Sequence, residues 1–336
     1  VFKNIFQLTS KASHLGSIKE AFRSEGSEMS FFPLIREEWN NSLYGPIAVS
    51  NLLYYHLFEK AISKLPHQNK GFYISENQAW ERVFIHSWYK FGHGNLIAVA
   101  HATVRFWDMR YSSDSRLTDQ SYSENFLPFP DFVALNGKAA FDNYFTVEYP
   151  IKSIKECEAL RFSNINQKGI TTKRQHLLKD SKRVLILGDY LPRGTENIMK
   201  LLQETMHLLP ENLTFTIKPH PAHLVSIKDY PLLKLDIVSD ALEDLLSNYD
   251  IAYASNFTSA SVDAYITGMR IVVFLDDNQL NVSPLRSRDN VIFVNTPEQL
   301  AKAFTNKEAV KQINSSEDFF FLDPKLPQWN KILTEN

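Results

Sequence analysis

The sequence has very little cysteine and no long apolar run. Its 336 residues include one cysteine, Cys157, so no disulfide can form within the chain, and no cysteine–histidine cluster has the spacing of a zinc site. Such a chain is typical of a reducing compartment, which favours a cytoplasmic location. No apolar run reaches the length of a membrane span, and the N-terminal residues lack the pattern of a secretory signal.

Net charge and glycine-rich loops are also scarce. The formal net charge is -2, so there is no general basic surface to hold a nucleic-acid backbone, and we expect no nucleic-acid partner. This net charge does not exclude a local basic pocket that binds a small anion. No Walker-type glycine loop is present, which argues against kinase or ATPase chemistry. Hydrophobic residues make up 44% of the chain, which is typical of a globular protein with a real core.

What the sequence does have, over residues 178–305, is an alternation of short apolar strands and amphipathic helices. β-Branched strands separated by helices favour a parallel, doubly wound sheet with both faces covered. We expect Thr195 and Thr296 to cap two of the helices. The predicted strands are 183–189, 213–221, 233–239, 250–255, 270–276 and 290–295, and the predicted helices are 195–209, 240–249, 259–268 and 296–304.

The N-terminal half is less regular. Residues 1–65 read as mostly helical, and the first residue is not Met, so we expect further N-terminal elements to be missing. Predicted strands follow at 71–77, 95–103 and 131–137, with helices at 78–92 and 138–145, a long loop at 110–130 and a connection at 150–182. We therefore expect an N-terminal domain (1–150), a C-terminal domain (151–305), and a tail (306–336) that packs back toward the N-terminal domain.

Polar residues follow three of the predicted C-terminal strands, where a doubly wound sheet binds its ligands. "TIKPHPAH" places Lys218 and His220 in a stiff frame, because two prolines bracket the histidine. Both side chains can donate hydrogen bonds to an anion. The alternative is a rigid turn whose histidine bonds a carbonyl, and the motif alone does not decide between the two.

"SNFTSASVDAYITG" begins with small and hydroxylic residues and continues as a helix. Hydroxyls and backbone N–H groups at a helix start can bind an anion. Helix capping alone would need only one hydroxyl. Together with Lys218 and His220, this segment predicts a phosphate site. Its candidate ligands are Ser255, Asn256, Thr258 and Ser259.

Further candidates follow other strands. Asp189, in "LGDYLPRG", can be a base, a nucleophile or a helix cap, and Arg193 beside it can hold an anion. Glu76 is placed to act as a general base. His101 and Arg105 follow another strand, and Arg105 can bind a carboxylate through two hydrogen bonds or form a structural ion pair. No set of acids has the spacing of a metal cage, so we expect no metal.

Five strings carry a resemblance to a known family. "SENQAWE", "FGHGNLIAVAHATVRFWDMRY", "LGDYLPRG", "IKPHPAH" and "SNFTSASVDAYITG" occur in that order between residues 71 and 295. The chain resembles GT-B glycosyltransferases of the bacterial surface-carbohydrate biosynthesis family. More distantly, it is similar to transferases that use CMP-activated ulosonic acids. The resemblance implies an α/β fold of the GT-B type, with two Rossmann-like domains facing a central cleft, the N-terminal one reduced or truncated. It also implies that residues 1–150 form the acceptor-side domain and residues 151–305 the nucleotide-sugar-binding domain.

The resemblance also implies roles for these residues. Lys218 and His220 would contact the nucleotide or its phosphate, and the hydroxyl segment would hold the phosphate. Asp189 would be the nucleophile of a retaining mechanism, and Glu76 the other catalytic carboxylate. The residues implied for the sugar carboxylate or the acceptor are His101, Arg105 and Arg193.

The function expected from this resemblance is transfer of an ulosonic acid, such as Kdo or a sialic-like sugar, from a CMP donor to a bacterial surface glycan. The acceptor would be a glycan or glycolipid, and no cofactor beyond the donor is implied. We expect a cytoplasmic protein, with peripheral association to membrane-bound assembly machinery left open. Two alternatives remain: a sugar-nucleotide epimerase or hydrolase on the same fold, and a non-catalytic nucleotide-binding subunit.

Overall fold

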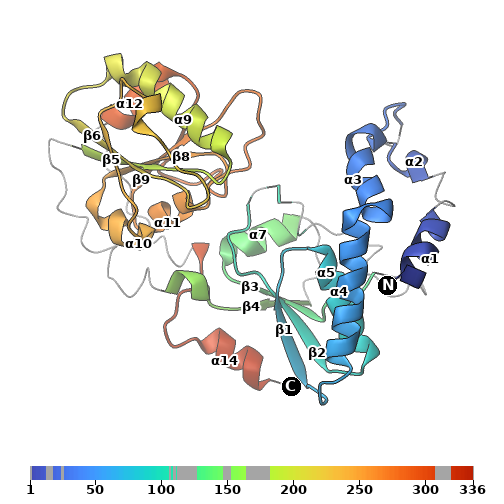
Figure 1. The fold of residues 1–336 in the computed structure, drawn as a ribbon. Coiled ribbons are helices and arrows are strands. Elements are labelled where there is room, and N and C mark those ends of the chain that lie inside the picture. The colour runs from blue at the N-terminus through green and yellow to red at the C-terminus, as the bar shows by residue number, and fades with distance from the viewer. Residues whose placement is uncertain are drawn as a thin grey trace. The chain divides into compact units, whose positions relative to one another are not determined.

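The computed structural model describes residues 2–12, 18–23, 26–105, 107–108, 111, 127–146, 153–163, 182–306 and 319–335. Most of the predicted loop 110–130 and connection 150–182, and the first part of the tail, lie outside these ranges. The chain divides into two compact units (Figure 1). One unit comprises Val1–Val99 and Asp114–Val133, and the other comprises Ala100–Ser113 and Ala134–Asn336.

The first unit begins with helices, as the sequence predicts, and continues with a β–α–β unit. Strands β1 and β2 are parallel, with Lys70 opposite Asn95 and Ile74 opposite Val99. The elements are α1 (Phe2–Ala12), α2 (Ile18–Ala21), α3 (Phe32–Tyr44), α4 (Pro46–Ile62), β1 (Lys70–Ile74), α5 (Ala79–Lys90) and β2 (Asn95–Val99).

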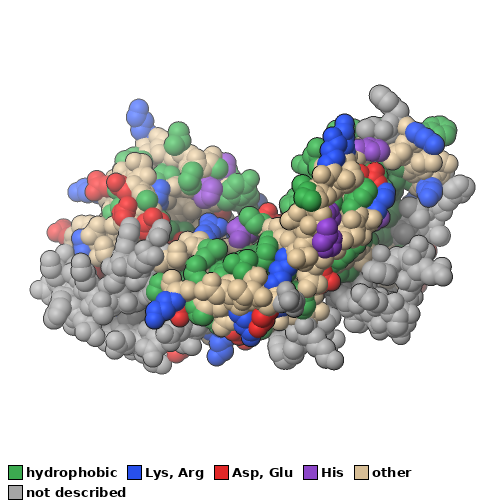
Figure 2. All heavy atoms as spheres, turned by 90° about the horizontal axis from the view of Figure 1, so that it is seen from below, with side chains coloured by type: hydrophobic (Ala, Val, Ile, Leu, Met, Phe, Trp, Pro, Cys, Tyr) green, Lys and Arg blue, Asp and Glu red, His purple; other side chains and the backbone are tan. Residues whose placement is uncertain are grey.

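Helices α3 and α4 leave much apolar surface uncovered. Helix α3 buries no side chain, and α4 buries only Ala48 and Ile62. Leu53, Tyr54 and Leu57 of α4 are all exposed. Apolar side chains lie among basic and histidine side chains over this region (Figure 2). Within the described residues, no helix is both long enough and apolar enough to cross a membrane.

The smaller sheet has four strands in the described part of the chain, in the order β1-β2-β3-β4. The short strand β4 and the turn η3 that follows it were not predicted from the sequence. The elements that follow β2 are β3 (Phe132–Leu135), α7 (Lys138–Thr146), β4 (Ile154–Glu156) and η3 (Leu160–Phe162).

The larger sheet has six parallel strands in the order β10-β9-β8-β5-β6-β7. The strand order therefore reverses between β5 and β8, as in a doubly wound fold. The predicted strand–helix alternation is confirmed. Its elements are β5 (Lys182–Leu187), α9 (Pro192–Thr205), β6 (Leu213–Lys218), β7 (Leu235–Ile237), α10 (Leu242–Leu245), β8 (Ile251–Ser255), α11 (Ala260–Ile266), β9 (Arg270–Phe274), β10 (Val291–Val294) and α12 (Pro297–Thr305).

Alternating side chains of the buried strands fill two cores, one on each face of this sheet. Along β5, Leu185 and Leu187 pack on the side of α10 and α11, whereas Val184 and Ile186 pack on the side of α9 and α12 (Figure 1). This alternation follows from the two-residue period of a strand. Both faces are apolar, which is why the strands read as nearly continuous hydrophobic runs.

One predicted helix start is wrong and another is confirmed. Helix α9 begins at Pro192, not near Thr195, because proline is tolerated in the first turn of a helix. The Thr195 hydroxyl instead accepts a hydrogen bond from the Asp189 backbone N–H at 2.8 Å. Thr296 does cap α12, since its hydroxyl accepts from the Gln299 N–H at 3.3 Å.

The C-terminal segment completes the core beside α11. Phe319, Phe320 and Leu322 are buried there. The backbone of Phe321 donates to the Asn136 carbonyl and accepts from the Ala159 N–H. The last helix is α14 (Pro327–Thr334), whose first backbone N–H groups donate to the buried carboxylate of Glu158.

Candidate functional site

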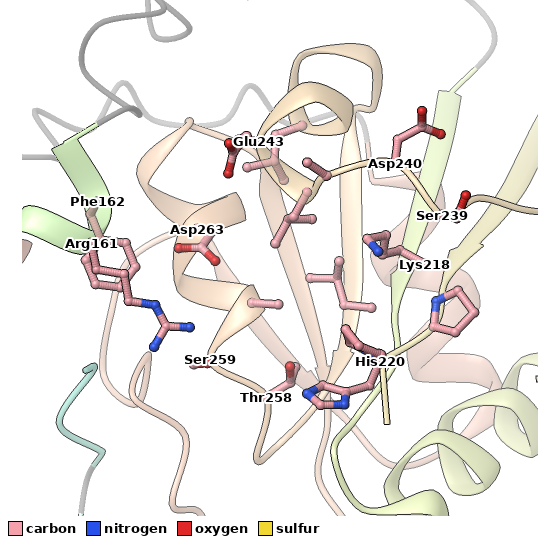
Figure 3. Close-up of a pocket in the computed structure, with 18 residues that line it drawn as sticks. Arg161, Phe162, Lys218, His220, Ser239, Asp240, Glu243, Thr258, Ser259 and Asp263 are labelled. Atoms are coloured by element: carbon pink, nitrogen blue, oxygen red, sulfur yellow. The ribbon is translucent and has the colours of Figure 1, made fainter. Parts of the chain in front are cut away.

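A cavity of about 390 Å³ lies at the carboxyl ends of β5, β6 and β7, bounded by α10 and the start of α11. It lies within the second unit, beside the point where the strand order reverses. Figure 3 shows its labelled side chains, with His220 and Thr258 at one end and Glu243 at the other. Ligands of doubly wound sheets bind at this position, so the cavity is the candidate site.

His220 is held in one orientation. Its ring Nδ1 accepts a hydrogen bond from the Ala222 N–H at 3.1 Å, and the Tyr190 ring packs edge-on against it at 5.4 Å between centroids. An Nδ1 that accepts carries no proton, so in the neutral ring the proton is on Nε2. The imidazole therefore offers an N–H donor through Nε2, which suits an anionic oxygen.

The loop that contains His220 packs directly against the end of β5. The Gly188 N–H donates to the Lys218 carbonyl at 2.9 Å. A Cβ on Gly188 would lie 2.7 Å from the His220 backbone nitrogen and 3.0 Å from the Pro219 Cα. Real side chains do not approach backbone atoms this closely, so only glycine fits here. Glycine at this position lets both loops line one cavity.

The hydroxyl segment divides between the cavity and the scaffold. Thr258 and Ser259 line the cavity, and Ser259 precedes α11 without a side-chain cap hydrogen bond. Ser255 instead donates its hydroxyl hydrogen bond to Asp189, and Asn256 donates to the Leu280 carbonyl at 2.8 Å. Of the six residues predicted for the phosphate, Lys218, His220, Thr258 and Ser259 line the cavity, whereas Ser255 and Asn256 do not.

Asp189 joins two loops at the reversal point. Its side chain is buried, and one carboxylate oxygen accepts from the Leu191 N–H at 3.0 Å while the other accepts from the Ser255 hydroxyl. A Cβ on Gly194 would lie 2.6 Å from the same carboxylate, so glycine makes room for it. These contacts link the loop after β5 to the last residue of β8. The predicted catalytic role of Asp189 stays a prediction.

Four charged residues of the cavity wall, Arg161, Asp240, Glu243 and Asp263, were not predicted. Asp263 on α11 is largely desolvated, and this burial raises the pKa of its carboxyl from the ordinary 3.8 to about 7. The nearby Arg161 guanidinium opposes the rise, and the Glu243 carboxylate adds to it. Within the described residues, Arg161 stacks 5.8 Å above the Phe162 ring and forms no salt bridge. The cavity wall thus carries cations on two opposite sides, Arg161 and Lys218, together with carboxylates.

The remaining predicted site residues do not line this cavity. Glu76 follows β1 in the first unit, where its backbone N–H donates to the Glu81 carboxylate at 2.8 Å. His101 and Arg105 are half-buried after β2, and Arg193 is exposed in the first turn of α9. Their predicted roles stay predictions.

Two further kinds of chemistry can be assessed from the described residues. The single thiol, Cys157, is fully buried, and burial raises its pKa to about 12, so it is a poor nucleophile at neutral pH. No group of three or more histidine, cysteine or acidic side chains in the described ranges could hold a metal ion.

Comparisons with known proteins identify similar structures. No protein-family model and no curated protein matches the sequence. A Listeria monocytogenes structure, described as a candidate UDP-N-acetylglucosamine 2-epimerase, has a TM-score of 0.53 at 14% identity over 85% of this chain and 77% of its own. S. aureus MnaA in complex with UDP scores 0.51 at 10% identity, over 81% and 77% of the two chains. Neisseria meningitidis UDP-GlcNAc 2-epimerase bound to UDP-GlcNAc scores 0.51 at 12% identity, over 80% and 77%.

At these identities the likeness shows the fold. The chain has an α/β fold of the GT-B type with two Rossmann-like sheets, and the N-terminal sheet is the smaller in the described part of the chain. The α/β fold of the GT-B type predicted from the sequence is therefore confirmed. Two of these three structures contain a nucleotide, UDP or UDP-GlcNAc, so they do not test the predicted CMP donor.

Proposed function

We propose that this protein is a glycosyltransferase that moves an ulosonic acid from a CMP-activated donor to a bacterial surface glycan. One observation carries the proposal. A cavity at the carboxyl ends of the parallel strands brings together Lys218, His220, Thr258 and Ser259, which are donors for a phosphate, from two loops far apart in sequence. The family resemblance of those two loops supplies the CMP-sugar assignment.

The phosphate would bind at the end of the cavity formed by His220 and Thr258. His220 Nε2–H and the two hydroxyls would donate to the phosphate oxygens, and Lys218 would neutralise part of its charge. A CMP donor leaves as a monophosphate, which carries less charge than a diphosphate. Fixed donors in a partly desolvated site can stabilise such a leaving group without a metal ion.

The sugar carboxylate needs a second cation, and Arg161 is our candidate. Its guanidinium lies toward the end of the cavity that holds Ser259 and Thr258, on the far side from Lys218 (Figure 3). It forms no salt bridge within the described residues, so a carboxylate of the donor could accept two parallel hydrogen bonds from its guanidinium. The resemblance implied Arg105 or Arg193 for this role, but neither lines the cavity.

The transition state would have oxocarbenium character, which rewards a nearby carboxylate. Asp189 and Glu76 remain our proposed catalytic carboxylates. To act as a nucleophile, Asp189 would have to release the Ser255 hydroxyl that it binds in this structure. We therefore expect its reactivity to depend on donor binding.

Calorimetric titration tests the donor assignment. We expect the protein to bind CMP and a CMP-ulosonate, and His220→Ala to weaken that binding about tenfold, since it removes a donor to a charged oxygen. His223→Ala is the matched control, because His223 belongs to the same loop but does not line the cavity. Binding of UMP or GMP in place of CMP would refute the assignment. Equal losses in both variants would make the His220 effect one of loop structure.

A sugar-nucleotide epimerase is the second candidate, because the similar structures reported above include UDP-GlcNAc 2-epimerases. Product analysis separates the two functions. An epimerase converts a sugar nucleotide in the absence of any acceptor, whereas a transferase releases CMP in proportion to the glycan that it extends. Conversion of UDP-GlcNAc without an acceptor would favour the epimerase.

A further inference from the structure

The two ends of the cavity differ in chemistry. His220, Thr258 and Ser259 occupy one end, and Glu243 lies at the opposite end (Figure 3). A nucleoside monophosphate has its phosphate and its base at opposite ends. If the phosphate binds at the His220 end, as in the proposed function, the base faces the end formed by α10.

The α10 end combines apolar surface with a hydrogen-bond acceptor. Leu242 and Leu246 line the cavity there and present hydrocarbon to the flat face of a base. Glu243, on the same short helix, holds its carboxylate on the side of the cavity where Asp263 lies, whereas the Asp240 carboxylate points away from the cavity (Figure 3). The Glu243 charge is close enough to Asp263 to affect the ionisation of that buried carboxyl. Glu243 is therefore the carboxylate placed to meet the edge of a base.

We infer that Glu243 selects the base of the donor by accepting a hydrogen bond from the exocyclic amine of cytosine. This inference rests on the proposed function, which places the phosphate at the other end. Cytosine presents an N4 amine as a donor, and a carboxylate accepts from it, whereas uracil presents the O4 acceptor at the same position. A carboxylate facing O4 has no hydrogen to share and repels it. Glu243 would thus exclude UDP-sugars.

Guanine and adenine also carry exocyclic amines, so the same carboxylate chemistry could serve a purine. Titrations with CMP, UMP, GMP and AMP distinguish these sources. We expect CMP to bind most tightly, about tenfold more tightly than UMP, which is the size of effect that one hydrogen bond to a charged group produces.

The decisive variant is Glu243→Gln, with Asp240→Asn as its control. A glutamine amide can accept from cytosine or donate to uracil, so the variant should lose most of the preference for CMP over UMP. Asp240 also lines the cavity and is exposed like Glu243, but it lies two residues before α10 and its carboxylate points away from the cavity. Asp240→Asn should therefore keep the wild-type preference. Both replacements are isosteric and at exposed positions, so both variants should fold.

The outcomes separate this inference from the proposed function. Preference for CMP in the wild type that survives in Glu243→Gln would overturn the role of Glu243 and leave the CMP donor standing. Loss of the preference in both variants would also overturn it, because a general charge effect would then explain the result. Tighter binding of UMP, GMP or AMP than of CMP by the wild type would overturn the cytosine assignment. Absence of nucleotide binding would refute the proposed function and the inference with it.

Discussion

Replacing Asp189 tests whether this residue links loops, reacts with substrate, or does both. Its buried carboxylate accepts from the Leu191 N–H at 3.0 Å and from the Ser255 hydroxyl. Asp189→Ala would leave both donors without an acceptor. A hydrogen bond to a charged group contributes about 1.5–3 kcal/mol, so we expect this variant to lose about 3–5 kcal/mol of unfolding free energy. Asp189→Asn keeps an acceptor oxygen and should lose about 1–2 kcal/mol.

Urea denaturation measures these losses, and a double-mutant cycle with Ser255→Ala isolates the bond between the two side chains. If this hydrogen bond stabilises the fold, the sum of the stability losses of the two single variants should exceed the loss of the double variant by about 1 kcal/mol or more. Additive losses, or a loss below about 1 kcal/mol for Asp189→Ala, would refute the linking role.

Transfer assays on the folded Asp189→Asn variant address catalysis. A nucleophile replaced by an amide should abolish transfer while CMP binding stays intact. A residue that only positions the loops should instead keep measurable transfer and show a raised KM. These two patterns differ in kcat, so one kinetic series decides between them.

Three further predictions follow from the same structure. Gly188→Ala would force a Cβ to within 2.7 Å of the His220 nitrogen; we expect a loss of about 1–3 kcal/mol in thermal melts and weaker CMP binding in titrations. The pKa of Asp263 is raised to about 7 in the folded protein, so its ionisation destabilises the fold as pH rises from about 4 to 7. Asp263→Asn should therefore raise Tm more at pH 8 than at pH 5, and its gain in unfolding free energy should be larger at pH 8 by about 3 kcal/mol; an equal effect at both pH values would contradict the burial argument. Glu158→Ala removes the acceptor of the first N–H groups of α14, and we expect it to weaken the attachment of this helix by about 2–4 kcal/mol. Limited proteolysis should then cut near Trp329 faster, whereas an unchanged cleavage pattern would show that packing alone holds the helix.

The sheet could be predicted from the sequence because its signal is local. Runs such as the "VLIL" of "RVLILGD" are apolar throughout, and helices with a polar face separate them, which is the pattern of a strand buried on both faces. Helix starts were predicted less well. Thr195 looked like a cap, but Pro192 was the better signal, since proline favours the first helical turn. Strand β4 has only three residues and no distinctive pattern, so its sequence gave no usable signal.

The site could be predicted only in part. Parallel strands bring their carboxyl ends to one edge of a sheet. The local sequence pattern was therefore enough to predict that four residues at strand ends line one site, namely Lys218, His220, Thr258 and Ser259. Arg161 precedes the larger sheet in the sequence and reaches the cavity only through the packing of Phe162 into the core, which no local pattern reveals.

The roles of Ser255 and Asn256 depended on strand order. Ser255 can reach Asp189 because β8 lies next to β5, although β6 and β7 separate them in the sequence. Asn256 is held by the Leu280 carbonyl in a loop after β9. Composition and spacing do not specify such neighbours, so both residues looked equivalent to the hydroxyl residues that do line the cavity.

Synthesis on the ribosome delivers the last part of the second unit's core late. Phe319, Phe320 and Leu322 pack beside α11, and Phe321 hydrogen-bonds to Asn136, which is translated long before it. Until these phenylalanines emerge, Phe162 and Tyr265 lack the aromatic rings that cover them in the finished protein. During this interval the nascent unit exposes apolar surface, which makes it more prone to aggregate than the finished protein.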